Sequence, residues 1–149
     1  MFLVSEARQQ PFNNHPICTV FDTKLYHDIV QYTSSNIGLV RYHTLLHDAN
    51  FLQSDILIPI HLPGHYNGAI LSFTAQCIAV MDPYHKAQHR VVVELQSWYL
   101  GEYARFHGSS PSKSSQFNIM NWKVITGTSL PSNLPRQPTS DTWRYGPIS

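Results

Sequence analysis

The chain has 149 residues, 42% of them hydrophobic and 13% charged, with a formal net charge of +1. This length and composition are typical of one globular domain with a buried core. Ten basic residues are balanced by nine acidic ones and are scattered, which argues against a nucleic-acid-binding surface. The sequence has neither the roughly 18 consecutive apolar residues of a membrane span nor a signal-peptide core. We therefore expect an intracellular protein, in the nucleus or cytoplasm, whose partner is neither a membrane nor a nucleic acid.

Cysteine and histidine usage predicts no metal site and no disulfide. Cys18 and Cys77 are not part of a CxxC pair, and without a secretory signal we expect both to be free thiols. The nine histidines include no HExxH motif and have no neighbouring cysteine ligands, so a zinc site is not expected.

The N-terminal part of the sequence predicts a lead-in followed by one helix. Residues 1–22 contain two prolines and little periodicity, which predicts an extended segment before a domain spanning residues 23–149. Residues 23–38 have apolar side chains at helical spacing. Thr23 is the expected N-cap of this helix, and Gly38 is its expected end.

Three strands are predicted between residues 56 and 81. The segment DILIPIH places Ile56, Ile58 and Ile60 on one face with a period of two. GAILSF and QCIAVM repeat this alternation, and the short TA between them predicts a hairpin.

The C-terminal half predicts a long helix and a fourth strand. The segment RVVVELQSWYLGEYARFHG returns to helical spacing and ends at Gly108, a suitable C-cap. The serine-rich run at 108–116 has the composition of a flexible surface loop. Residues 117–125 predict a strand, and the proline-rich residues 126–149 have no regular period. Helices and adjacent strands together indicate the α+β class.

His65 and Asp82 are candidate catalytic residues because they flank the predicted hairpin. Antiparallel pairing of 66–73 with 76–82 brings both to the same edge of the sheet. An imidazole that activates a nucleophile needs a carboxylate on its other nitrogen to fix its tautomer. On spacing alone, the alternative interpretation is a histidine in a surface turn and an aspartate that begins a DP turn.

Several segments, in this order, resemble the ubiquitin-like-protein-specific (Ulp-type) cysteine proteases, the SUMO-deconjugating family related to the adenovirus protease. LYHDIVQY is similar to the Trp-Leu-Asn-Asp helix that opens that domain, with Leu25 at the Trp position. DILIPIH resembles the strand before the catalytic histidine, and GHYNGAILSF resembles the following His-Trp motif with Tyr66 replacing Trp. AVMDPYH resembles the strand that ends in the catalytic aspartate, although Pro83 stands where Ser is usual.

The resemblance implies a papain-like fold of the adenain type, with a central mixed or antiparallel sheet flanked by helices. It also implies that His65 is the general base, that Asp82 orients its imidazole and that Gln137 lines the oxyanion hole. Because Gln137 lies slightly farther from the nucleophile position than is usual, Thr139 is the alternative for that position. The nucleophile position itself is Tyr145, where the family has Cys.

Tyr145 predicts that the chain does not hydrolyse peptides, since a phenol of pKa about 10 is not ionised at neutral pH. Cys77 lies inside a strand pattern and Cys18 in the lead-in, so neither is expected to replace the missing thiol. In the family the cysteine begins a central helix. We expect this domain to stop before that helix and therefore to be incomplete.

Two functions remain open. The first is that of a cysteine-type peptidase whose family activity is proteolysis of ubiquitin-like protein conjugates, similar to SUMO removal. We expect this chain to be inactive in its present form. The second is that of a non-catalytic pseudoprotease or interaction domain that binds a ubiquitin-like modifier. Neither requires a cofactor.

Overall fold

The computed structural model describes residues 8–10, 18–35 and 49–127, and the side chains of 18–31 and 49–127. Strands are β1 (Arg8–Gln10), β2 (Cys18–Val20), β3 (Asp55–Leu62), β4 (His65–Ser72), β5 (Cys77–Met81) and β6 (Lys123–Thr126). Helices are α2 (Lys24–Ser35) and α4 (His89–His107), with short 3-10 helices η1 (Ala49–Gln53) and η2 (Ile119–Asn121).

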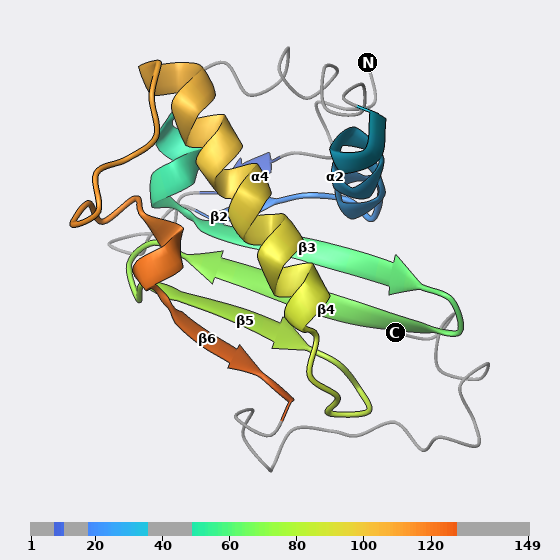
Figure 1. The fold of residues 1–149 in the computed structure, drawn as a ribbon. Helices are drawn as coiled ribbons and strands as arrows, with labels where there is room; N and C mark the ends of the chain where they lie inside the picture. The colour runs from blue at the N-terminus through green and yellow to red at the C-terminus, as the bar shows by residue number, and fades with distance from the viewer. Residues whose placement is uncertain (1–7, 11–17, 36–48, 128–149) are drawn as a thin grey trace.

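The six strands of the described residues form one mixed sheet in the order β1-β2-β3-β4-β5-β6. The pairs β2–β3 and β5–β6 are parallel, and the other neighbouring pairs are antiparallel. Helix α4 crosses the face of the sheet formed by β3, β4 and β5, and α2 lies to one side of α4 (Figure 1). The expected α+β class is therefore confirmed.

The predicted hairpin of β4 and β5 is confirmed. Ser72 pairs with Cys77 next to the turn, and the ladder continues to Gly68 opposite Met81. The turn covers residues 73–76 and is longer than the expected TA. The hydroxyl of Ser72 accepts a hydrogen bond of 3.1 Å from the backbone N–H of Ala75, which holds the start of this turn.

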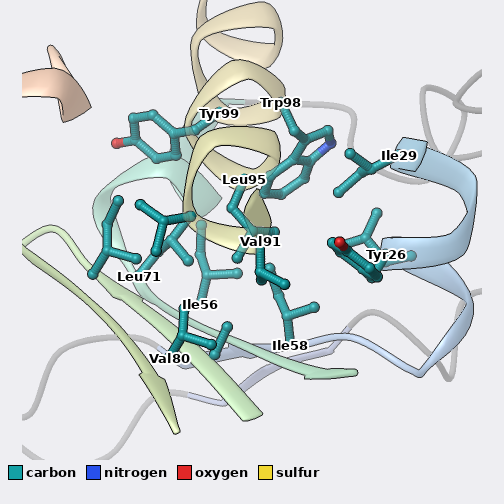
Figure 2. Close-up of a cluster of buried hydrophobic side chains, with 14 of the residues drawn as sticks. Tyr26, Ile29, Ile56, Ile58, Leu71, Val80, Val91, Leu95, Trp98 and Tyr99 are labelled. Carbon is teal, nitrogen blue, oxygen red and sulfur yellow. The ribbon is translucent and has the colours of Figure 1, made fainter. Parts of the chain in front are cut away.

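The core lies between α4 and the sheet. As the alternation predicted, Ile56, Ile58 and Ile60 of β3 are all at most 1% exposed. Val91 and Leu95 of α4 point down onto the strands from above (Figure 2). Because apolar side chains on both elements leave water together, this contact supplies the main driving force for the fold.

A second part of the core joins α4 to α2. The indole of Trp98 on α4 points toward Ile29 of α2 in Figure 2. It also makes an edge-to-face contact with Phe21, with ring centroids 5.7 Å apart. The fully buried Tyr99 donates a 2.7 Å hydrogen bond from its hydroxyl to the backbone carbonyl of Leu52, which fixes η1 under the helix.

The helix ends follow local signals in the sequence. Helix α4 ends as predicted at Gly108, whose φ of 79° is left-handed and whose N–H donates to the carbonyl of Ala104. Helix α2 begins one residue after Thr23, the expected cap. The carboxylate of Asp22 accepts a 3.0 Å hydrogen bond from the N–H of Lys24, so Asp22 caps this end.

The lead-in contributes to the sheet. Residues 18–20 form β2, which pairs with β3 at Cys18 opposite Asp55, and residues 8–10 pair with β2. The expected boundary at residue 22 therefore does not separate the lead-in from the sheet. A strand of three residues has too short a pattern to be distinguished from other extended chain in the sequence.

The predicted strand at 117–125 is only partly correct. Within its first half, Ile119–Asn121 form η2, which begins where the side chain of Asn118 accepts a hydrogen bond from the N–H of Met120. Only Lys123–Thr126 is a strand. The preceding serine-rich loop is attached to η2 by a hydrogen bond, because the carbonyl of Lys113 accepts a 2.6 Å hydrogen bond from the side-chain amide of Asn121.

We expect Leu95→Ala to lower the free energy of unfolding by about 3 kcal/mol, because it leaves a cavity beneath α4 at a fully buried position. Urea unfolding followed by circular dichroism measures this change. The control is Val93→Ala on the same helix, where the side chain is 58% exposed and the expected change is within about 0.5 kcal/mol. Equal effects of the two variants would contradict the packing of α4 on the sheet.

We expect Tyr26 to make the fold less stable in strong alkali. Burial, and then the nearby Glu94 carboxylate, raise the pKa of Tyr26 from 10.0 to about 12. Because the folded chain holds this proton more tightly than the unfolded chain, stability falls as the pH rises from about 10 to about 12. Urea unfolding at several pH values should show a shallower fall for Tyr26→Phe than for the unmodified chain. An identical slope would contradict this assignment.

Candidate functional site

The structure brings His65 and Asp82 together at one end of the sheet. His65 is the first residue of β4, and Asp82 directly follows β5. Gly68 pairs with Met81, so the same antiparallel register places Asp82 beside Asn67, which is two residues from His65 on β4. Nε2 of His65 lies 3.7 Å from Oδ1 of Asp82. The His65 side chain is 17% exposed and that of Asp82 is fully buried, so the imidazole lies between the carboxylate and the surface.

The strand period sets the direction of both side chains. In β4, Asn67, Ala69 and Leu71 are buried beneath α4, and His65 occupies the preceding inward position. In β5, Val80 is buried on the same face, and Asp82 follows two residues later. Successive side chains of a strand alternate between its faces, so the candidate pair shares the face covered by α4.

The Asp82 carboxylate also holds the turn between β5 and α4. Oδ1 accepts a 2.9 Å hydrogen bond from the N–H of Tyr84, and Oδ2 accepts a 2.7 Å bond from the side-chain amide of Gln88. The backbone carbonyl of Asp82 accepts from the N–H of His85 at 2.8 Å. These bonds direct the carboxylate toward the turn, and the 3.7 Å gap to His65 exceeds hydrogen-bond length.

Tyr84 lies against the imidazole. Its ring makes an edge-to-face contact with His65 at 5.2 Å between centroids. Burial and the nearby Asp82 carboxylate raise the pKa of Tyr84. Its hydroxyl is therefore a neutral phenol at neutral pH, and it is buried without a hydrogen-bond partner within the described part of the chain. Tyr84 thus adds an apolar wall and an unused polar group beside the candidate pair.

The end of β6 reaches the same turn. The hydroxyl of Thr126 accepts a 3.0 Å hydrogen bond from the backbone N–H of Gln88. Gly127 follows with a φ of 60°, and a side chain there would come within 3.0 Å of the backbone of Ala87. The chain therefore leaves β6 in close contact with the turn that Asp82 holds.

The remaining predicted site residues cannot be located relative to His65. Gln137, its alternative Thr139 and the nucleophile position Tyr145 all lie outside the described residues. Their assignments stay predictions.

Neither cysteine lies near His65. Cys18 pairs with Asp55, Asp55 with Ser72, and Ser72 with Cys77, so one row across the sheet contains both thiols. That row is at the opposite end of the eight-residue strand β4 from His65. The separation along the strand is about 20 Å, far beyond the reach of a hydrogen bond.

The environment of Cys18 also opposes a nucleophilic role. Burial and the neighbouring Asp55 carboxylate raise the pKa of the Cys18 thiol, whereas a reactive cysteine needs a lowered pKa. Both cysteines are free, as expected.

Three residues of this region were not predicted from the sequence. Gln88 contacts Asp82, and Tyr84 contacts His65, because of the path that the turn takes. No sequence pattern predicts these two contacts. Asn67 had a usable signal, because it is a polar residue at an inward position of the apolar strand β4.

Within residues 8–10, 18–35 and 49–127, no group of three or more His, Cys, Asp and Glu side chains is arranged to hold a metal ion. Over the same part of the chain, no helix combines the length and apolar character that crossing a membrane requires.

Comparison with known proteins adds no assignment, since no protein-family model and no curated protein matches this sequence. The function must be inferred from the site itself.

We expect Asp82→Ala to lower the free energy of unfolding by about 3 kcal/mol, because it leaves the Tyr84 N–H and the Gln88 amide without their buried acceptor. Asp82→Asn is the matched variant: it keeps one oxygen acceptor, and we expect a smaller loss. Urea unfolding at neutral pH compares them. A change within about 0.5 kcal/mol for Asp82→Ala would contradict the anchoring role of this carboxylate.

Proposed function

We propose that this chain is a cysteine-peptidase-like domain of the Ulp type, with a papain-like fold of the adenain type, that has lost cleavage but still binds a ubiquitin-like modifier. The observation that carries the proposal is the 3.7 Å approach of His65 Nε2 to the buried Asp82 carboxylate. The two residues stand at the ends of neighbouring antiparallel strands, in the order and strand context of the resembled family.

This pair has the chemistry of a base and its orienting carboxylate. With Nε2 turned toward Asp82, the imidazole keeps Nδ1 for a nucleophile. A thiol beside Nδ1 would lose its proton to the ring, and the resulting thiolate would attack a carbonyl carbon. Tyr145 at the family's thiol position cannot perform this step at neutral pH. The proposed domain therefore keeps the catalytic histidine and aspartate but does not hydrolyse a substrate.

A second observation supports the proposal. β6 runs parallel to β5 and ends beside the turn of residues 82–88, through the Thr126 hydrogen bond and the Gly127 contact. The residues that carry Gln137 and Tyr145 follow directly in the sequence. The last described residue, Gly127, therefore lies at the end of the sheet where His65 lies.

The proposed ligand is the extended C-terminal tail of a ubiquitin-like modifier or of its conjugate, in the nucleus or the cytoplasm. This substrate class comes from the resemblance of the DILIPIH, GHYNGAILSF and AVMDPYH segments, which surround the candidate pair.

The second candidate function is that of an interaction domain without peptidase ancestry. It is favoured by the two hydrogen bonds that the Asp82 carboxylate accepts from its own turn, because these give the carboxylate a purely structural role. The two candidates differ in what they predict for His65, since only the peptidase-like site needs the imidazole to act on position 145.

The test restores a thiol in a Tyr145→Cys variant that also contains Cys18→Ser. Cys77 remains as an internal control, because it lies about 20 Å from His65 along β4. Mass spectrometry follows iodoacetamide alkylation at both positions as a function of pH. We expect the thiol at position 145 to be alkylated faster than Cys77 at about pH 5, because a thiolate paired with an imidazolium persists there.

The variant His65→Ala in the same background should return position 145 to the behaviour of an ordinary thiol. The substrate class is tested by a ubiquitin-like modifier with a C-terminal vinyl sulfone, which should label position 145 faster than the free vinyl sulfone does. An ordinary pH dependence at position 145 that does not respond to His65→Ala would exclude the peptidase-like site and favour the interaction domain.

A further inference from the structure

Asn67 is a buried amide without a hydrogen bond in the described part of the fold. Its side chain is 5% exposed, and neither Nδ2 nor Oδ1 has a hydrogen-bond partner among the residues that the structure describes. The next inward positions of β4 are Ala69 and Leu71, both apolar and buried. Burying an amide without partners costs free energy that an apolar side chain of similar size would not cost. Asn67 therefore weakens the core unless its amide has another role.

The position of Asn67 connects it to the candidate pair. The β4–β5 register, which pairs Gly68 with Met81, continues to Asn67 beside Asp82. On its own strand, Asn67 is the next inward residue after His65, about 7 Å away. A histidine and an asparagine at that spacing can form a hydrogen bond through rotation of their side chains. Nε2 of His65 is likewise buried and makes no hydrogen bond to any of the described residues.

The Asp82 carboxylate can still accept a hydrogen bond from Asn67. Its two oxygens already accept from the Tyr84 N–H and the Gln88 amide, and the gap to His65 is 3.7 Å. Each carboxylate oxygen can accept a second hydrogen bond, so Asp82 can still receive one from the Nδ2 group of Asn67. A carboxamide placed between the two can accept from the imidazole and donate to the carboxylate at the same time.

We infer that Asn67 is a positioning residue for His65: when the two side chains rotate toward each other, Oδ1 of Asn67 accepts a hydrogen bond from Nε2–H of His65, and Nδ2 of Asn67 donates to Asp82. This link fixes the rotation of the imidazole and keeps its proton on Nε2, so that Nδ1 carries no proton and can act as the base. The inference rests on the proposed function, because it gives the imidazole the orientation that a base requires.

The test observes the Nε2–H proton of His65 by NMR in the unaltered chain labelled with ¹⁵N-histidine, with His65→Gln to assign the signal. We expect a signal protected from exchange with water. In Asn67→Val, which keeps a strand-forming side chain, exchange should become several-fold to about tenfold faster, as expected for one lost hydrogen bond. Asn67→Ala serves as the second variant if Asn67→Val does not fold by circular dichroism. A purely structural asparagine would leave this signal unchanged.

Asp82→Asn separates the outcomes. If Asp82→Asn speeds exchange and Asn67→Val does not, the role of Asn67 is excluded and the proposed function stands. If neither variant changes the exchange, or if the unaltered chain shows no protected Nε2–H, His65 is not positioned by either side chain. In that case both the role of Asn67 and the proposed function are excluded. Faster exchange in Asn67→Val supports the inference, whatever Asp82→Asn does.

Discussion

The register of β4 on β5 is the constraint on which the rest of the site depends. With Gly68 opposite Met81, every inward side chain of the hairpin faces α4, and His65 and Asp82 meet at one end. A slip of one residue in one strand would turn its side chains to the other face of the sheet. The buried Leu71 and Val80 make such a slip costly, because they would lose their contact with the core. The hydrophobic core and the candidate site are therefore set by the same pairing.

The parts of the fold that the sequence predicted are those with local, periodic signals. The alternation of Ile56, Ile58 and Ile60 and the helical spacing of α4 each extend over enough residues to be distinguished from chance. The approach of His65 to Asp82 was also predictable, because a hairpin brings the outer ends of its two strands together. The α+β class follows from these elements alone.

The parts that the sequence did not predict depend on contacts between distant segments. β2 has three residues and joins the sheet by parallel pairing with β3, which no local pattern specifies. Gln88 reaches Asp82 because of the path of one turn, and Tyr84 reaches His65 in the same way. Asn118 interrupts a predicted strand by capping η2 with its side chain, a competition between side chain and backbone that apolar periodicity cannot reveal. Gln137 and Tyr145 remain predictions, since they lie outside the described residues.

The two cysteines share a face of the sheet as well as a row. Cys18 and Cys77 are three strands apart, which corresponds to about 14 Å between backbones, whereas a disulfide requires Cα atoms within about 7 Å. Their row alternates with the buried row of Ile56, Leu71 and Ile78, so both thiols lie on the face opposite α4. An oxidant therefore cannot close a bridge inside one folded chain without breaking strand pairs.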